Sequence, residues 1–303
     1  VKSEVKQAMD NRFKGQAFGL LAATFLMWGG VYVAGRLISD AVPPPLLACL
    51  RCCCAMLPLL WMSRGCLGRV HVDRADWKYF AAVGLLGYFL TIFCIQIGIS
   101  LTGASMAALL NALTPVSVTL LAALVLKEPI TPVKVACLIL ALAGAAVITL
   151  GAGTQGQLLG ILAVVLSILS WGLASVYMRR LTAKYPPILV TTYGMAVSLI
   201  GHIPVGIATA VSQPFTIDVS VVLVILYLGF FGSGVAQFTW VKSLSMLPAS
   251  TCSLFYPLQP VFAAVLGALI LGERFTPAFF LGLALISADV ALSTWETKKL
   301  SGS

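Results

Sequence analysis

Charged side chains are scarce in this sequence: Asp, Glu, Lys and Arg together make up 10% of its 303 residues. A soluble domain carries about 25% charged residues, which cover its water-facing surface. Hydrophobic residues make up 60% of this chain, and its mean hydropathy is +1.01. The composition therefore excludes a soluble globular protein and predicts a protein embedded in a lipid bilayer.

Acidic residues are fewer than basic ones, 10 against 19, which gives a formal net charge of +9. This excess does not indicate a nucleic-acid partner, because most basic residues fall in alternate loops between apolar segments. The positive-inside rule places those loops and both termini in the cytoplasm and predicts a multi-pass protein of the plasma (inner) membrane. The basic residues on that side are Lys2, Lys6, Arg12, Lys14, Arg64, Arg69, Arg74, Lys78, Lys127, Lys134, Arg179, Arg180, Lys184, Lys242, Lys298 and Lys299.

Histidine is nearly absent, with two residues, and the eight cysteines show no metal-ligand pattern. Cys49 and Cys52 have a CxxC spacing, but they fall inside an apolar segment with no histidine nearby, where cysteine packs as a small apolar residue. Cys66 falls in a cytoplasmic loop, where thiols stay reduced. We therefore predict no metal site and no cofactor.

Long apolar runs are what the sequence does have. Ten of them can cross a bilayer core, which takes about 20 residues. A helix is the only structure of this length that satisfies its own backbone in lipid. We predict an all-α membrane protein with ten transmembrane helices and no soluble domain. The helices are expected at 16–38, 43–62, 78–98, 101–125, 132–150, 157–178, 187–210, 219–243, 249–271 and 277–296.

The second half of the chain repeats the first. Residues 84–132 align without a gap on 229–277, and 17 of the 49 positions are identical. Five predicted helices on each side of the midpoint make the repeat odd-numbered, so the second copy must insert upside down. Inverted repeats around a central cavity are typical of secondary transporters. The predicted divisions are a cytoplasmic segment at 1–15, repeats at 16–150 and 157–296, and a cytoplasmic tail at 297–303.

Paired motifs connect the sequence to a known family. Trp28-Gly29 recurs as Trp171-Gly172, and the stretch Pro115-Val116 through Glu128 to Thr131-Pro132 recurs as Pro260-Val261 through Glu273 to Thr276-Pro277. With Arg51, these motifs resemble the EamA-type transporters of the drug/metabolite transporter superfamily over residues 16–296. The resemblance implies a basket of ten helices around a central cavity. It also implies gradient-driven transport of a small solute, such as an amino acid, another metabolite or a cofactor-like molecule.

Two prolines mark the predicted substrate site. Pro115 and Pro260 interrupt helical hydrogen bonding and free the carbonyls of the residues four positions earlier. The polar residues at and next to these positions share one helix face in each repeat, because they are three residues apart. We expect this face to bind substrate near the bilayer centre, the alternative being a polar contact that only joins the halves. These residues are Asn111, Thr114, Tyr256 and Gln259.

Further aromatic and amide side chains are candidates for the cavity wall. Each of them has core packing or anchoring at the membrane interface as its alternative role. The candidates are Trp28, Trp171, Tyr88, Gln96, Gln237 and, close to the cytoplasmic end of its helix, Trp240.

Two charges fall deep in predicted membrane helices, where they are costly and usually pair or face water. We expect Arg51 to be a structural or gating residue, with direct substrate contact as the alternative. Asp289 is a proton site, a partner of Arg51 or part of a helix contact. Glu128 and Glu273 each precede a helix that opens with Thr-Pro, and we expect them to act as hinge-and-cap residues at the positive end of that helix.

The sequence therefore predicts a secondary-active transporter that exports a small zwitterionic or amphipathic metabolite, most simply an amino acid, by alternating access. It has no GxxxxGK[ST] loop for ATP and no paired catalytic residues in the membrane, so we expect no enzyme. The expected partners are the bilayer and a small substrate, and the chain is a monomer or a weak homodimer. The alternatives are a multidrug, amine or cofactor-like metabolite carrier of the same fold and, more remotely, a channel or an intramembrane enzyme.

Overall fold

The computed structural model describes residues 2–111, 113–126, 155–247, 249–253, 255, 256, 258–272, 277, 280, 281 and 284. These residues form helices and connecting turns, with no strand among them. The predicted helices at 132–150 and, for most of its length, 277–296 lie outside the described residues. Glu128, Glu273 and Asp289 also lie outside them.

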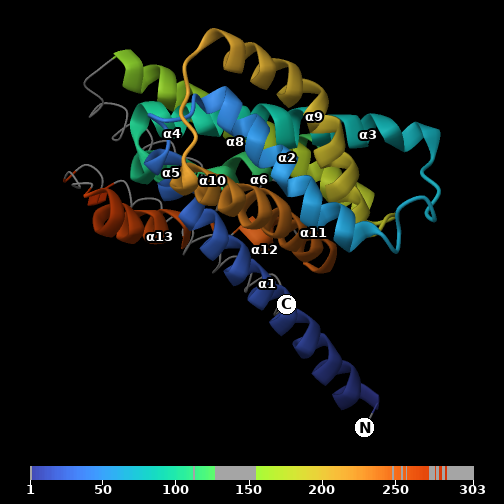
Figure 1. The fold of residues 1–303 in the computed structure, drawn as a ribbon. Helices are drawn as coiled ribbons and strands as arrows, with labels where there is room; N and C mark the ends of the chain where they lie inside the picture. Colours follow the sequence, from blue (N-terminus) through green and yellow to red (C-terminus); the bar gives the residue numbers. More distant parts are fainter. Residues whose placement is uncertain are drawn as a thin grey trace.

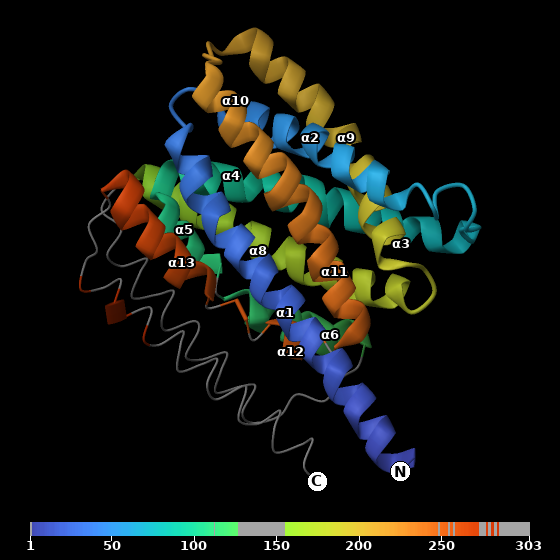
Figure 2. The same ribbon diagram turned by 60° about the horizontal axis from the view of Figure 1, so that its bottom comes forward.

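The helices pack side by side in one bundle, and the long first helix projects beyond it at its N-terminal end (Figures 1 and 2). The α-helices of the first half are α1 (Lys2–Leu37), α2 (Pro44–Ser63), α3 (Trp77–Ala82), α4 (Thr91–Thr102), α5 (Ala104–Asn111) and α6 (Thr114–Leu126). Those of the second half are α8 (Gln155–Thr182), α9 (Pro187–Ser212), α10 (Val219–Leu226), α11 (Ala236–Met246), α12 (Ala249–Ser253) and α13 (Leu258–Leu266). A short 3₁₀ turn, η1 (Arg74–Asp76), precedes α3, and η2 (Val83–Leu90), η3 (Tyr227–Val235) and η4 (Gly267–Leu271) are π-helical.

Six helical stretches are long and apolar enough to cross a membrane. Each overlaps at least one of the ten predicted transmembrane helices, so the structure confirms helices long and apolar enough to span a membrane at these six places. The stretches are Gly15–Leu37, Pro44–Ser63, Arg74–Thr102, Gln157–Thr182, Pro187–Ser212 and Val219–Met246.

The predicted helix at 101–125 is not continuous. Helix α4 ends at Thr102, and a glycine with a positive φ of 87°, Gly103, separates it from α5. Leu113 lies in a turn, and α6 begins at Thr114, directly before Pro115. Proline has no N–H to donate to the preceding turn and is accommodated best in the first turn of a helix, where α6 places Pro115. The single helix expected here is therefore wrong, because the motif that marked the site also divides the segment.

Glycines bring the two halves into close contact at equivalent positions of the repeat. A Cβ on Gly84 of η2 would lie 2.7 Å from the carbonyl oxygen of Gly194 on α9. A Cβ on Gly229 of η3, 145 residues later, would lie 2.9 Å from the carbonyl oxygen of Arg51 on α2. The third crossing of each half thus packs on the second crossing of the other half at backbone distance.

A second pair of glycines repeats this exchange. A Cβ on Gly87 would lie 2.7 Å from the side chain of Ala174 on α8, and one on Gly232 would lie 2.5 Å from Val31 on α1. Gly87 and Gly232 are 145 residues apart, and Val31 and Ala174 are 143 apart, which is the spacing of the Trp-Gly motif. Corresponding segments of the repeat therefore have corresponding partners. The π-helical segments η2 and η3 also fall at corresponding positions.

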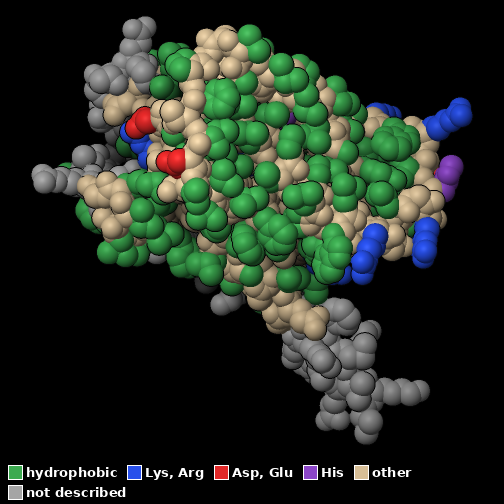
Figure 3. All heavy atoms as spheres, in the orientation of Figure 1, with side chains coloured by type: hydrophobic (Ala, Val, Ile, Leu, Met, Phe, Trp, Pro, Cys, Tyr) green, Lys and Arg blue, Asp and Glu red, His purple; other side chains and the backbone are tan. Residues whose placement is uncertain are grey.

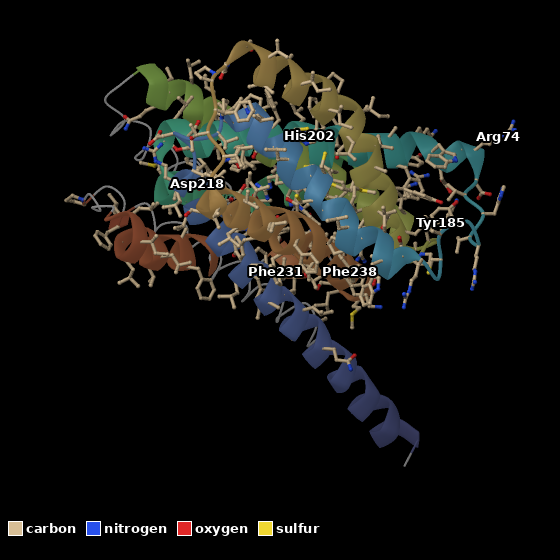
Figure 4. All side chains as sticks on the ribbon, in the orientation of Figure 1. Arg74, Tyr185, His202, Asp218, Phe231 and Phe238 are labelled. Atoms are coloured by element: carbon tan, nitrogen blue, oxygen red, sulfur yellow. The ribbon has the colours of Figure 1, made fainter. Side chains whose placement is uncertain are left out.

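The surface is a broad apolar band with charge at its two ends (Figure 3). The exposed Asp218 lies at one end, and the exposed Arg74 lies at the other. Figure 4 shows Asp218 and Arg74 on opposite sides of the bundle. Large apolar side chains such as Leu158 and Ile200 are exposed. This distribution suits a protein whose middle faces lipid and whose ends face water.

At the basic end, one polar cluster ties the loop between α8 and α9 to the start of the third crossing. Lys184 Nζ lies 2.9 Å from the Oδ2 atom of the buried Asp76, and Tyr185 Oη donates to the same oxygen at 2.9 Å. The backbone N–H of Asp73 in turn donates to Tyr185 Oη at 3.1 Å. The hydrogen bond to Asp76 raises the pKa of Lys184, so the pair stays charged at neutral pH.

Candidate functional site

A cavity with a mainly apolar lining and a few polar side chains lies inside the bundle, between helices of both halves of the chain. Its volume is about 60 Å³, which is enough to hold water. Helices α1, α2, α4, α5, α8, α11 and α13 contribute to its wall. The lining residues are Trp28, Val31, Tyr32, Arg51, Thr91, Ile92, Ile95, Asn111, Ser167, Trp171, Gln237, Tyr256 and Gln259.

The two proline motifs meet at this cavity. Asn111 Nδ2, at the end of α5, donates a hydrogen bond of 2.9 Å to Gln259 Oε1 on α13. Gln259 is buried, whereas Asn111 is half-buried. These residues stand 148 positions apart in the chain. The contact therefore joins the predicted polar faces of the two halves, as the repeat suggested.

The carbonyls that the prolines free have partners of their own. The hydroxyl of the buried Thr114 donates to the carbonyl oxygen of Asn111 at 2.6 Å. The backbone N–H of Gln259 donates to the carbonyl oxygen of Tyr256 at 2.9 Å. The side chains of Asn111, Tyr256 and Gln259 line the cavity, while Thr114 lies behind them and secures the break between α5 and α6. Pro115 is buried in the first turn of α6, and Pro260 lies in α13.

Aromatic rings form one side of the cavity. The rings of Trp28 and Trp171, which occupy equivalent positions of the repeat, lie 5.8 Å apart between centroids and meet edge to face. Trp171 Nε1 donates to Tyr256 Oη, and Trp28 Nε1 donates to the carbonyl oxygen of Gly232 at 3.1 Å. Trp240 packs behind the lining rings, 5.7 Å from Trp28 and 6.2 Å from Trp171. Each indole of the lining is held by both packing and a hydrogen bond.

Arg51 supplies the positive charge of the lining. Its side chain is 3% exposed and extends from α2. Its Nε–H donates to Ser233 Oγ on η3 at 2.7 Å, and its Nη1 donates to Gln96 Oε1 on α4 at 3.4 Å. Both acceptors are neutral. Within the described part of the chain, the positive charge of Arg51 is therefore stabilised by polar groups and not by an acidic side chain.

Two lining residues carry buried polar atoms that have no partner among the described residues. They are Ser167 Oγ on α8 and Gln237 Oε1 on α11. Buried polar atoms in native proteins nearly always find a hydrogen-bond partner, either in the protein or in water. A solute or a water in the cavity would supply it, so the site can bind both a hydrogen-bond donor and an acceptor.

Two predicted wall residues lie behind the cavity surface. Tyr88 is buried with its ring 6.1 Å from that of Trp171, and Gln96 is buried against Arg51. Trp28, Trp171 and Gln237 are in the lining itself. The structure thus gathers most of the predicted wall around one cavity and places Tyr88 and Gln96 in the layer that supports it.

Some lining residues had little or no signal in the sequence. Tyr32 lies one helical turn after Trp28, and Thr91 follows the π-helical segment η2. Ser167 is the clearest, because it stands 143 residues after Thr24, the spacing of the two Trp-Gly motifs. That correspondence could have directed attention to Ser167, but Thr24 itself is packed against Thr239 at 2.6 Å between hydroxyl oxygens.

The fold and the cavity define a multi-pass helical membrane protein with a buried polar site between the two halves of its chain. The sequence matches the profile of the EamA-like transporter family twice, at residues 14–150 and 158–295. The chain therefore belongs to the EamA-like transporter family, within the drug/metabolite transporter superfamily. It is a transporter of that family, and the family consists of transporters and not of enzymes.

Curated relatives are similar over nearly their whole length. An uncharacterized transporter of Bacillus subtilis, YetK, is 25% identical over 294 residues, which cover 93% of this chain and 88% of the relative. A probable terminal-alkyne amino-acid exporter of Streptantibioticus cattleyicolor is 28% identical over 287 residues, which cover 93% and 94%. A solved crystal structure shares the fold with a TM-score of 0.70 and 22% identity, and the match covers 94% of this chain and 99% of that one.

Proposed function

We propose that this protein is a secondary-active carrier that exports a small zwitterionic metabolite, most simply an amino acid, across the plasma membrane. The observation that carries the proposal is the hydrogen bond between Asn111 and Gln259, because it joins the two halves at the wall of the central cavity. A substrate bound there contacts both halves at once. Movement of one half against the other then exposes the same site to either side of the membrane in turn.

Exchanged contacts between the halves support an inverted repeat in this proposal. Gly84 contacts α9, and Gly229 contacts α2. In each half, the third crossing therefore packs against the second crossing of the other half. A two-fold relation between the halves produces such exchanged pairs. The proposed repeats are residues 16–150 and 157–296. The positive-inside rule then puts the basic end and both termini in the cytoplasm.

The size of the cavity favours a moving site over a permanent pore. A volume of about 60 Å³ is well below the roughly 300–1,000 Å³ of pockets that hold drug-sized ligands. The site must therefore widen to admit an organic solute. Phe25, Trp28, Trp240 and Tyr256 pack as neighbouring rings on one side of it, with centroid separations from 4.9 to 6.3 Å. Separation of these rings is one route by which the halves could open.

The polar groups of the lining favour a zwitterion. Gln237 Oε1 is an acceptor suited to an ammonium group, whereas Ser167 Oγ and Arg51 are donors suited to a carboxylate. The indole faces of Trp28 and Trp171 add an apolar surface that also attracts cations. An amino-acid exporter among the relatives points to the same class of solute.

The test is counterflow in liposomes that contain the purified protein. Vesicles loaded with an unlabelled amino acid should take up the labelled one transiently and saturably, because a carrier exchanges solutes through one site. A panel of L-phenylalanine, L-leucine, L-threonine and phenethylamine covers the zwitterion and amine classes. Flux without saturation or counterflow would identify a channel, and counterflow of phenethylamine alone would identify an amine carrier. Metabolite profiling of cells that lack the protein would then narrow the natural substrate.

A further inference from the structure

Arg51 is a buried charge without an acidic partner among the residues that the structure describes. The only salt bridge recorded within them joins Lys184 to Asp76 at the basic end of the bundle. Arg51 lies in α2 with 3% of its surface exposed, and it forms part of the cavity wall. A permanent cation at membrane depth is costly, and such residues usually pair or line a pathway for polar solutes.

Two hydrogen bonds hold the Arg51 side chain in place and, among the described residues, leave some of its N–H donors free to bind a solute. An arginine has five N–H donors in a planar fork. Ser233 Oγ accepts one of them at 2.7 Å, and Gln96 Oε1 accepts a second at 3.4 Å. Three donors therefore have no partner among the described residues. Ser233 and Gln96 approach from η3 and α4, in different halves of the chain, and together they fix the direction of the guanidinium.

The close packing around Arg51 leaves little freedom for a different rotamer. A Cβ on Gly232 would lie 3.6 Å from Arg51 Nη2, and a Cβ on Gly35 would lie 3.0 Å from Gln96 Nε2. The glycines thus make room for the guanidinium and for the amide that accepts from it. Gln96 Nε2 is itself buried without a hydrogen-bond partner in the described part of the chain. Preorganised donors beside unsatisfied polar atoms are typical of a binding site.

Among the described residues that line the cavity, Arg51 is the one charged residue, and the others have apolar, aromatic, hydroxyl or amide side chains. A planar carboxylate matches the fork of a guanidinium and forms two parallel charge-assisted hydrogen bonds with it. An ammonium ion, in contrast, would be repelled from this part of the cavity.

We propose that Arg51 is the receptor for the substrate's carboxylate and so determines that the transporter carries carboxylate-bearing solutes. This inference rests on the proposed function, and it assigns a direct role to the residue for which the sequence favoured a structural or gating one. Bound in this way, the substrate's carboxylate pairs with the guanidinium. Its amino group is then directed toward Gln237 and the indole rings, away from the guanidinium.

The experiment compares amino acids with their carboxamides, which keep the amino group but lack the carboxylate, in wild-type protein and in Arg51→Gln. Binding of L-phenylalanine and L-phenylalaninamide, and of L-leucine and L-leucinamide, is measured by thermal stabilisation of the purified protein in detergent. The wild type should bind each acid more tightly than its amide. Arg51→Gln should lose about 10- to 100-fold in affinity for the acids, because hydrogen bonds to charged groups are lost. Its affinity for the amides should not fall, because the amides have no carboxylate to lose and their ammonium group is no longer repelled by the guanidinium.

Two further variants test the same inference if Arg51→Gln folds poorly. Arg51→Lys retains the charge without the fork and should keep part of the preference for acids. Ser233→Ala leaves the guanidinium intact but removes the acceptor that orients it, so it should weaken acids more than amides. Arg179→Gln is the matched control, because Arg179 is bound to the carbonyl oxygens of Leu244 and Leu247 and is absent from the cavity lining.

The outcomes separate this inference from the proposed function. If wild type binds and counterflows the amino acids but Arg51→Gln weakens acids and amides equally, Arg51 is structural and the present inference is wrong. Restoration of acid binding in Arg51→Gln with Asp289→Asn would show that Arg51 serves only to neutralise Asp289, which also overturns it. If wild type neither binds nor counterflows any acid in the panel, the proposed function fails and the inference fails with it.

Discussion

Replacement of Asn111 and Gln259 together by leucine is expected to abolish transport while leaving the protein folded. The two side chains join the halves of the chain across the cavity wall through a 2.9 Å hydrogen bond. Leucine provides neither the donor nor the acceptor that a zwitterion needs there. Two lost hydrogen bonds of about 1–3 kcal/mol each reduce binding by about 30-fold or more.

Folding should survive because both partners change at once. Substitution of one partner strands the other as a buried unsatisfied group, whereas substitution of both by apolar residues is close to neutral. The single variant Asn111→Leu should therefore be less stable than the double variant, since it leaves the Gln259 amide buried and unpaired.

The measurement is counterflow of the labelled amino acid by protein that elutes as a single species in size-exclusion chromatography. Ser212→Leu with Ser245→Leu is the matched control, because both serines are exposed and neither lines the cavity. Retained flux in the folded Asn111→Leu, Gln259→Leu protein would remove this pair from the substrate site.

Gly229→Leu is expected to destabilise the protein severely. A Cβ at this position would lie 2.3 Å from Cys54 Cβ and 2.9 Å from the carbonyl oxygen of Arg51. A clash with backbone cannot be relieved by a change of rotamer, so η3 and α2 must separate. Overpacking of this kind costs about 3 kcal/mol. Because α2 carries Arg51 and η3 carries Ser233, the same separation would also pull the guanidinium from its acceptor.

The midpoint of heat-induced aggregation in detergent measures this effect, with Gly19→Leu as the matched control. Gly19 is exposed on α1, and a Cβ there would meet nothing within 4 Å. Gly19→Leu should melt with the wild type, whereas Gly229→Leu should melt well below it. Equal midpoints for the two variants would contradict the backbone contact between η3 and α2. Gly84→Leu, the counterpart in the first half, should resemble Gly229→Leu.

The membrane class could be predicted from the sequence because it depends on the bilayer and not on the fold. A run of about 20 apolar residues must be helical in lipid whatever its neighbours are. The described crossings, such as Pro44–Ser63 and Pro187–Ser212, therefore fall where hydropathy placed them. The break beside Pro115 was missed because hydropathy does not register it. The segment remains apolar across the interruption.

The contact between Asn111 and Gln259 could be predicted from the sequence for a different reason. Duplication gives each repeat position a counterpart, so a polar residue that recurs beside Pro115 and Pro260 is constrained twice. Arg51 has no basic counterpart in the second half. The internal repeat therefore did not indicate which residues accept its hydrogen bonds. Ser233 and Gln96, which orient it, are 182 and 45 residues away from Arg51 in the chain.

By itself, the sequence determined that this chain lies in a membrane, that its halves are related and that its proline motifs belong together. Local composition and internal repetition are sufficient for these conclusions, because the bilayer imposes helices and duplication pairs the positions. Only the tertiary structure decided which side chains surround one cavity, which of them support it from behind, and that the guanidinium of Arg51 faces neutral acceptors. Those features depend on the rotation and contact of helices distant in the chain, which side-chain packing fixes and apolar periodicity does not encode.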